Sequence, residues 1–173
     1  VREKELGTME ILLVSPFRAL MVIVAKVIPY LLLSIVNITS ILLLSVYVLG
    51  LPILGSIPLL FGMSILFIIT SLALGVLVST IAATQQVAML VSMMGMLLPT
   101  LLFSGFMFPI ENMPLPLQLI SNLIPAKWYY NIVKAVMIKG LGIDAILKEV
   151  VILFGMSVLL TVISVRRFKV RLA

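Results

Sequence analysis

The residues able to do chemistry are few in this sequence, and they gather at its start. Three of the six acidic residues, Glu3, Glu5 and Glu10, lie within the first ten positions, interleaved with Arg2 and Lys4. Histidine and cysteine are absent from the sequence, which removes the commonest general base, metal ligand and thiol. No pair of carboxylates stands at catalytic spacing, and no glycine-rich turn is followed by Lys-Ser or Lys-Thr. The opening stretch therefore indicates a contact surface for another protein and not a catalytic, metal or ATP site.

The elements that must carry this surface are apolar. Hydrophobic residues make up 63% of the chain and charged residues 10%, against about half and a quarter in soluble domains. No charged residue occurs from position 27 to position 110. The apolar segments are too long for membrane strands and do not alternate, so the expected fold is all-α, a polytopic transmembrane helical bundle. The net charge of +6 is concentrated at the two ends and along one loop, which indicates flanks of membrane spans and no nucleic-acid partner.

We expect a short amphipathic helix over residues 1–18, on the water side, followed by a transmembrane domain over 19–173. At about 1.5 Å per residue, the first expected span is long enough to cross an apolar layer of about 30 Å. Lys26 is expected at the membrane interface, and Pro29 in the first turn of the span that follows. The predicted spans cover residues 27–49, 58–80, 87–103 and 145–165.

Two sets of small or polar residues recur within the spans. Ser34 and Asn37 share roughly one face of the first span with Ser45. They predict either hydrogen bonds to another helix, which is the favoured interpretation, or the lining of a substrate path. In the second span, Ser71, Gly75 and Ser79 recur at every fourth position and predict the close approach of another helix.

The segment 104–144 differs from the spans because it combines apolar residues with many helix breakers. Residues 103–114 predict a re-entrant hairpin on the outer side, shielded by protein. Its aromatic residues Phe103, Phe106 and Phe108 fit either an apolar plug or ordinary packing, and Glu111 follows them. Farther along, the aromatic run 128–130 beside a lysine predicts an anchor at the membrane interface.

Four spans place both ends of the chain on one side of the membrane. The basic tail at 166–171 and the basic residues before the first span favour the cytosol as that side. We therefore expect a multi-pass protein of the cytoplasmic (inner) membrane, with its hairpin facing outward. The chain begins at Val1 without an initiator methionine, and we expect it to be a fragment of a longer protein.

Several of these features together resemble a known family. The sequence is similar to the membrane subunit of an ABC-2-type exporter. Four segments carry the resemblance: the charged run 2–10 with the Ser15-Pro16 that follows it, the segment 26–30, the polar turn 79–86 and the breaker-rich segment 104–114. That group includes bacterial drug-efflux permeases, and the chain resembles the C-terminal half of one. Lys134 stands where many relatives would have arginine, so a role for that position is not carried over.

The resemblance implies six spans per subunit, two membrane subunits that are identical or different, and two cytosolic ATP-binding subunits. ATP and Mg would be bound by those partners, with no cofactor on this chain. The first helix would couple the two kinds of subunit by docking on the ATP-binding subunit. The coupling residues implied are Glu3, Glu5, Gly7, Thr8, Glu10, Ser15 and Pro16. The implied substrate path or outer gate would involve Ser34, Asn37, Phe103, Phe106, Phe108 and Glu111.

Two other classes of protein compete with an exporter of amphiphilic drugs or lipids. A membrane scaffold would use the same N-terminal helix to hold a soluble partner, without ATP-dependent movement. An intramembrane enzyme has little support, because candidate catalytic residues are missing.

Overall fold

The computed structural model describes residues 1, 5, 19–51 and 53–170, and this part of the chain is helical without strands. Most of the predicted coupling helix lies outside the described residues. The long helices are α3 (Ala19–Tyr47), α4 (Ile57–Ile81) and α9 (Leu147–Val170). The third span consists of α5 (Gln85–Ser92), the π-helix η1 (Met93–Leu97) and α6 (Leu98–Phe103). Between it and α9 lie η2 (Ile110–Asn112), α7 (Leu115–Ser121), α8 (Pro125–Val133), η3 (Lys134–Ile138) and η4 (Ile143–Ile146).

Within the described residues, four helices are long and apolar enough to cross a membrane, which confirms the predicted helical bundle. They cover Ile23–Tyr47, Ile57–Ile81, Gln85–Phe103 and Ile143–Arg167. The first begins earlier than predicted, because α3 continues through Lys26 without interruption. The expectation that Pro29 stands in a first turn is therefore wrong, since Pro29 lies inside α3. There its ring removes one hydrogen bond of the helix.

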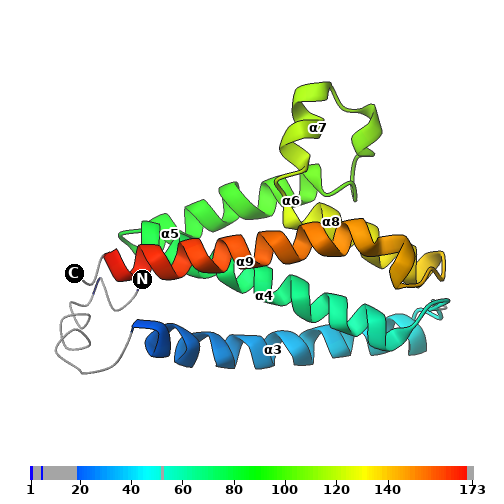
Figure 1. Cartoon of the computed structure of the whole chain (residues 1–173), viewed down its shortest axis with the longest axis horizontal. Helices are drawn as coiled ribbons and strands as arrows, with labels where there is room; N and C mark the ends of the chain where they lie inside the picture. The colour runs from blue at the N-terminus through cyan, green and yellow to red at the C-terminus, as the bar shows by residue number, and fades with distance from the viewer. Residues whose placement is uncertain (2–4, 6–18, 52, 171–173) are drawn as a thin grey trace.

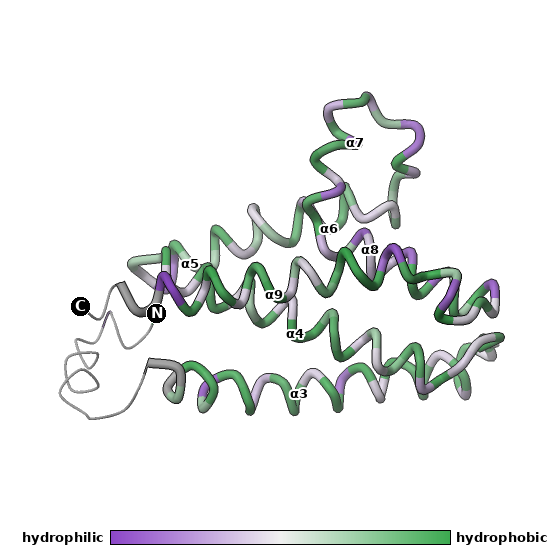
Figure 2. The backbone as a smooth tube through the Cα atoms, in the orientation of Figure 1, coloured by the Kyte–Doolittle hydropathy of each residue, from purple (hydrophilic) through white to green (hydrophobic). Residues whose placement is uncertain are grey.

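Helix α4 is the centre of the bundle, and α9 runs beside it over most of its length (Figure 1). The two helices approach closely at Ala73, whose carbonyl accepts a hydrogen bond of 2.8 Å from the Ser164 hydroxyl. Hydrophobic residues predominate along the long helices (Figure 2), and many of them are exposed, as expected of a chain whose solvent is lipid. The buried core is formed by Leu60, Trp128, Ile132, Val136, Ile146 and Leu153.

The third span changes its hydrogen-bond register just before Pro99. The amide of Leu98 donates to the carbonyl of Met93, five residues back, which defines the π-helix. Proline has no amide hydrogen and its ring crowds the preceding turn, so a widened turn relieves the clash.

After the third span and the predicted hairpin 103–114, the chain packs back against the spans. The elements that do so are α8 and η3. Helix α7 and its flanking loops project from the side of the bundle, whereas α8 lies along α9 (Figure 1). Helix α8 packs against both α4 and α9. Trp128, Ile132 and Val136 recur at every fourth position, and all three are buried. This helical spacing of large apolar residues explains why α8 and η3 enter the core.

The predicted aromatic anchor at the membrane interface is wrong for two of its three residues. Trp128 is buried, and its indole N–H donates to the carbonyl of Asn122 at 3.0 Å. Tyr129 stacks on Phe67 of α4, with ring centroids 4.3 Å apart and planes within 3°. Both side chains are therefore held in the bundle by the helix that carries them.

Close packing occurs at a glycine that the small-residue pattern did not single out. Gly75 of the predicted stripe has open space around it. By contrast, a side chain on Gly55 would lie 2.3 Å from the Val136 carbonyl oxygen. The neighbouring amide of Leu54 donates to the Met137 carbonyl at 3.1 Å. The turn between α3 and α4 is thus docked on η3.

Candidate functional site

A groove of ≈350 Å³ opens between α3, α4 and α8. Ser34 and Asn37, the two predicted substrate-path residues of α3, both line it, near the middle of the first span. The groove is lined by Ser34, Asn37, Ile38, Ile41, Ser64, Phe67, Ile68, Ser71, Leu72 and Tyr129. Its walls are mostly apolar, with five polar side chains among them.

A chain of hydrogen bonds fixes the polar groups at one wall of the groove. The Ser64 hydroxyl donates its one proton to the Leu60 carbonyl at 2.8 Å. The Tyr129 hydroxyl lies 2.8 Å from the same Ser64 oxygen. Because Ser64 has already donated, Tyr129 must be the donor in this pair. The Tyr129 oxygen therefore keeps its lone pairs as acceptors, while stacking on Phe67 holds the ring in place.

The remaining polar groups of the groove have no partner of their own. In the part of the chain that the structure describes, the side chains of Ser34, Asn37 and Ser71 make no hydrogen bond. The neighbouring Ser40 and Ser45 instead donate to carbonyls one turn back in α3. An unpaired amide in apolar surroundings costs free energy, so the groove is suited to receive a hydrogen-bonding group from a ligand or another chain.

Sequence reasoning missed Ser64 and Tyr129. Ser64 interrupts an otherwise apolar part of the second span, which is a weak signal on its own. Tyr129 belongs to the aromatic run that the sequence assigned to the membrane interface. Only the return of α8 into the bundle brings this hydroxyl to the groove. The apolar spacing in α8 indicates a buried face but not the helices against which it packs.

A second cluster lies where the third span begins. The Glu5 carboxylate accepts a hydrogen bond of 3.1 Å from the Gln85 amide and a second, short one from the Gln85 side chain. These bonds lower the pKa of Glu5. The next turn is capped by Thr84, whose hydroxyl accepts from the Val87 amide at 3.2 Å. The predicted contact segment thus meets the predicted polar turn 79–86 at Glu5. The other predicted coupling residues lie outside the described residues: Glu3, Gly7, Thr8, Glu10, Ser15 and Pro16.

The contact between Glu5 and Gln85 should depend on pH. Because the pKa of Glu5 is lowered in the folded protein, the contact is favoured above the ordinary value near 4.5 and is lost as the pH falls through the lowered value. We expect the Gln85 amide to be protected from hydrogen exchange at neutral pH and less protected once the pH falls below the lowered pKa of Glu5, after correction for intrinsic exchange. A Glu5→Gln variant should show no such step, and equal protection of the wild-type amide above and below that pKa would contradict the assignment.

The predicted outer-gate residues do not line the groove. Phe103 is half-buried at the end of α6, whereas Phe106, Phe108 and Glu111 are exposed. Phe106 meets Tyr130 edge-on, with centroids 6.3 Å apart. The structure pairs Phe106 with a ring of α8 and shows no mutual stacking of the three phenylalanines among the described residues.

The fold and the groove define a multi-pass α-helical membrane protein with hydrogen-bonding groups at mid-membrane depth. The chain belongs to the ABC-2 family of transporter proteins, whose family model matches residues 1–166.

The curated relatives agree with this membership. The chain is 35% identical to the probable multidrug ABC transporter permease YbhS of Escherichia coli over 80% of its length and 37% of the relative's. It is 31% identical to the inner membrane transport permease YhhJ of the same species, over 98% of this chain and 45% of the relative. It is 30% identical to ABC transporter G family member 20 of Dictyostelium discoideum, over 89% of this chain and 21% of the relative. The chain thus spans less than half the length of these relatives, and no solved structure matches it.

Proposed function

We propose that this chain is part of the membrane subunit of an ATP-driven exporter, which moves an amphiphilic drug or lipid-like molecule across the cytoplasmic membrane. The observation that carries the proposal is the groove between α3, α4 and α8, where unpaired polar groups meet apolar walls. The naming of relatives as multidrug permeases supports the same class of substrate. Both ends of the chain face the cytosol in this proposal, and a second permease subunit completes the transporter.

The groove matches the two parts of an amphiphile. Its aliphatic walls accept hydrocarbon, while Asn37 offers both a donor and an acceptor and Tyr129 offers an acceptor. A hydroxyl or amide group crossing the membrane needs such partners, because lipid supplies none. The sequence favours another role for Ser34 and Asn37, namely hydrogen bonds to another helix. Substitution of Asn37 distinguishes that role from substrate binding.

Energy reaches the bundle through the N-terminal segment. ATP and Mg are bound by a cytosolic partner, and closure of that partner displaces the segment of Glu5, which contacts the start of the third span. The scaffold alternative uses the same segment to hold a partner that never moves it. The two proposals differ in whether the contact responds to nucleotide.

A single introduced cysteine tests this difference. The sequence has no cysteine, so Thr8→Cys creates a unique crosslinking position in it. The variant is crosslinked to the ATP-binding protein that co-purifies with it, with ATP and without. A yield that changes with nucleotide supports the exporter, and a constant yield favours the scaffold. Absence of a crosslink in a folded, membrane-inserted complex would remove the support for coupling.

The groove itself is tested by Asn37→Leu, which keeps the branched shape of the side chain but removes its hydrogen-bonding groups. We expect export of amphiphiles that the wild type exports to fall by about tenfold, the effect of losing one hydrogen bond to an otherwise unpaired group. Ser40→Ala is the matched control on the same helix, because the Ser40 hydroxyl is bonded to Val36 and lies outside the groove. Unchanged export in Asn37→Leu, or loss of subunit association instead, would assign Asn37 to helix packing.

A further inference from the structure

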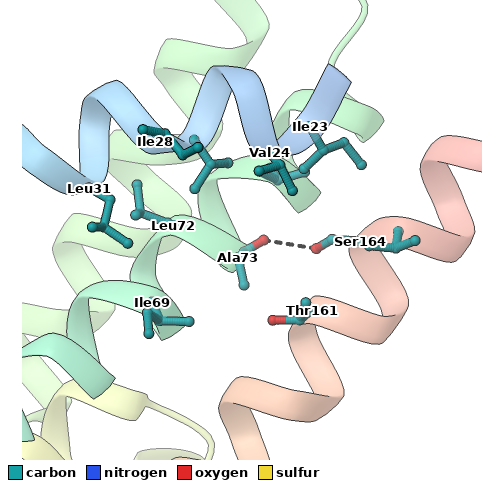
Figure 3. Close-up of a pocket in the computed structure, with 12 residues that line it drawn as sticks. Ile23, Val24, Ile28, Leu31, Ile69, Leu72, Ala73, Thr161 and Ser164 are labelled. Carbon is teal, nitrogen blue, oxygen red and sulfur yellow. Dashed lines mark hydrogen bonds between the residues drawn. The ribbon is translucent and has the colours of Figure 1, made fainter. Parts of the chain in front are cut away.

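A second cavity, of ≈270 Å³, lies where α3, α4 and α9 meet. It is close to the ends of α3 and α9 that hold Ala19 and Val170, and Leu72 of α4 lines both this cavity and the groove. In Figure 3, side chains of α3 such as Val24 and Ile28 face Ala73 and Leu72 of α4, with Ser164 of α9 closing the third side.

The cavity offers hydrocarbon surface and no available polar group. Its two hydroxyls are both engaged within the protein: Thr161 donates to the Ser157 carbonyl, and Ser164 donates to Ala73, each at 2.8 Å. The other ten lining residues are apolar. A cavity of this kind stays dry and takes an apolar group, in contrast to the polar groove.

Two arginines follow the last cavity-lining residue of α9. Val165 lines the cavity and is followed by Arg166 and Arg167, both of which are exposed. Neither arginine forms an ion pair with any described residue. Helix α3 has no acidic residue, and the acidic residue of α9, Glu149, lies at the opposite end of that helix. The positive charge beside the cavity is therefore not balanced by the described parts of these helices.

We propose that this cavity holds one acyl chain of an anionic phospholipid, whose phosphate lies against Arg166 and Arg167. Basic residues beside a crevice between membrane helices are suited to an acidic lipid headgroup, and arginine pairs with phosphate through two parallel hydrogen bonds. A helix of a second subunit, about 10 Å wide, needs more room than this cavity provides. The acyl chain would pack between α3, α4 and α9 and so hold α3 against the bundle.

Photolabelling tests the acyl-chain part of the proposal. The purified protein, in nanodiscs, is irradiated with phosphatidylglycerol that carries a diazirine on one acyl chain, and labelled peptides are identified by mass spectrometry. We expect labels concentrated on residues 23–31 and 161–165. Thr161→Phe fills the cavity and should remove most of this label, whereas Val162→Phe, one position along and outside the cavity, should leave it unchanged. Equal labelling of both variants would overturn the proposal.

The headgroup part is tested with exposed residues, whose substitution leaves the core intact. Replacing Arg166 or Arg167 by glutamine should reduce the preference for phosphatidylglycerol over phosphatidylcholine by about fivefold, and replacing both by about 30-fold. Lysine at both positions should restore most of the preference, and Lys139→Gln at the other end of the bundle should not alter it. A double variant with unchanged preference, or wild-type labels spread evenly over the lipid-facing surface, would show ordinary surrounding lipid and overturn the site.

Discussion

Replacing Glu5 with lysine should separate ATP hydrolysis from export. The substitution removes the acceptor of both hydrogen bonds from Gln85 and places a positive charge beside the N-terminus of α5, where the helix dipole is unfavourable to cations. ATP hydrolysis by the assembled transporter should continue, while export falls by about tenfold or more, as expected for loss of a charged hydrogen-bond acceptor. Both rates are measured on the same reconstituted complex.

Glu5→Gln is the matched control for this prediction. Glutamine keeps one carbonyl acceptor for the Gln85 amide without the charge, so export should be intermediate. Full export by Glu5→Lys would show that the contact does not transmit movement. Loss of hydrolysis together with export would instead show that the substitution prevents assembly with the ATP-binding partner.

A substitution at Gly55 should have the largest effect on stability. The methyl group of alanine would lie 2.3 Å from the Val136 carbonyl oxygen, and a backbone atom cannot move aside as a side chain can. Overpacking costs about 1–3 kcal/mol, and a backbone clash belongs at the upper end of that range. The thermal midpoint of the detergent-solubilised protein should therefore fall by about 6 °C or more.

Gly62 provides the comparison for Gly55 within the same part of the chain. It lies inside α4 with open space around it, so Gly62→Ala should be neutral or should stabilise the helix by about 1 kcal/mol. Equal midpoints for the two alanine variants would show that the turn does not need to pack so closely on η3.

The parts of the fold predicted from the sequence are those that the bilayer dictates. The absence of charge from 27 to 110 and the length of each apolar run specify the spans, because lipid tolerates neither charge nor unpaired backbone. The start of α3 was misplaced because Lys26 and Pro29 suggest a boundary, yet the helix continues through both. Helix propensity and packing with α4 outweigh these local signals.

The sequence predicts the residues of the candidate site that lie on α3, but not the one that lies on α8. Ser34 and Asn37 are recognisable because polar residues in a span demand an explanation. Tyr129 was assigned to the membrane surface, since an aromatic run beside a lysine is typical of interfaces. Its position in the groove depends on α8 packing back between α4 and α9, which is a tertiary contact without a sequence motif.

The docking of the turn around Gly55 on η3 also determines how α3 can move. At that end, the backbone hydrogen bond from Leu54 to Met137 connects the turn after α3 to the core that contains Val136. At the other end, a cavity lies between α3, α4 and α9. If the proposed coupling displaces α3 near Ala19, we therefore expect the helix to pivot at this turn. The displacement should then be largest near Ala19 and smaller towards the turn, so that Asn37 moves less than Ile23.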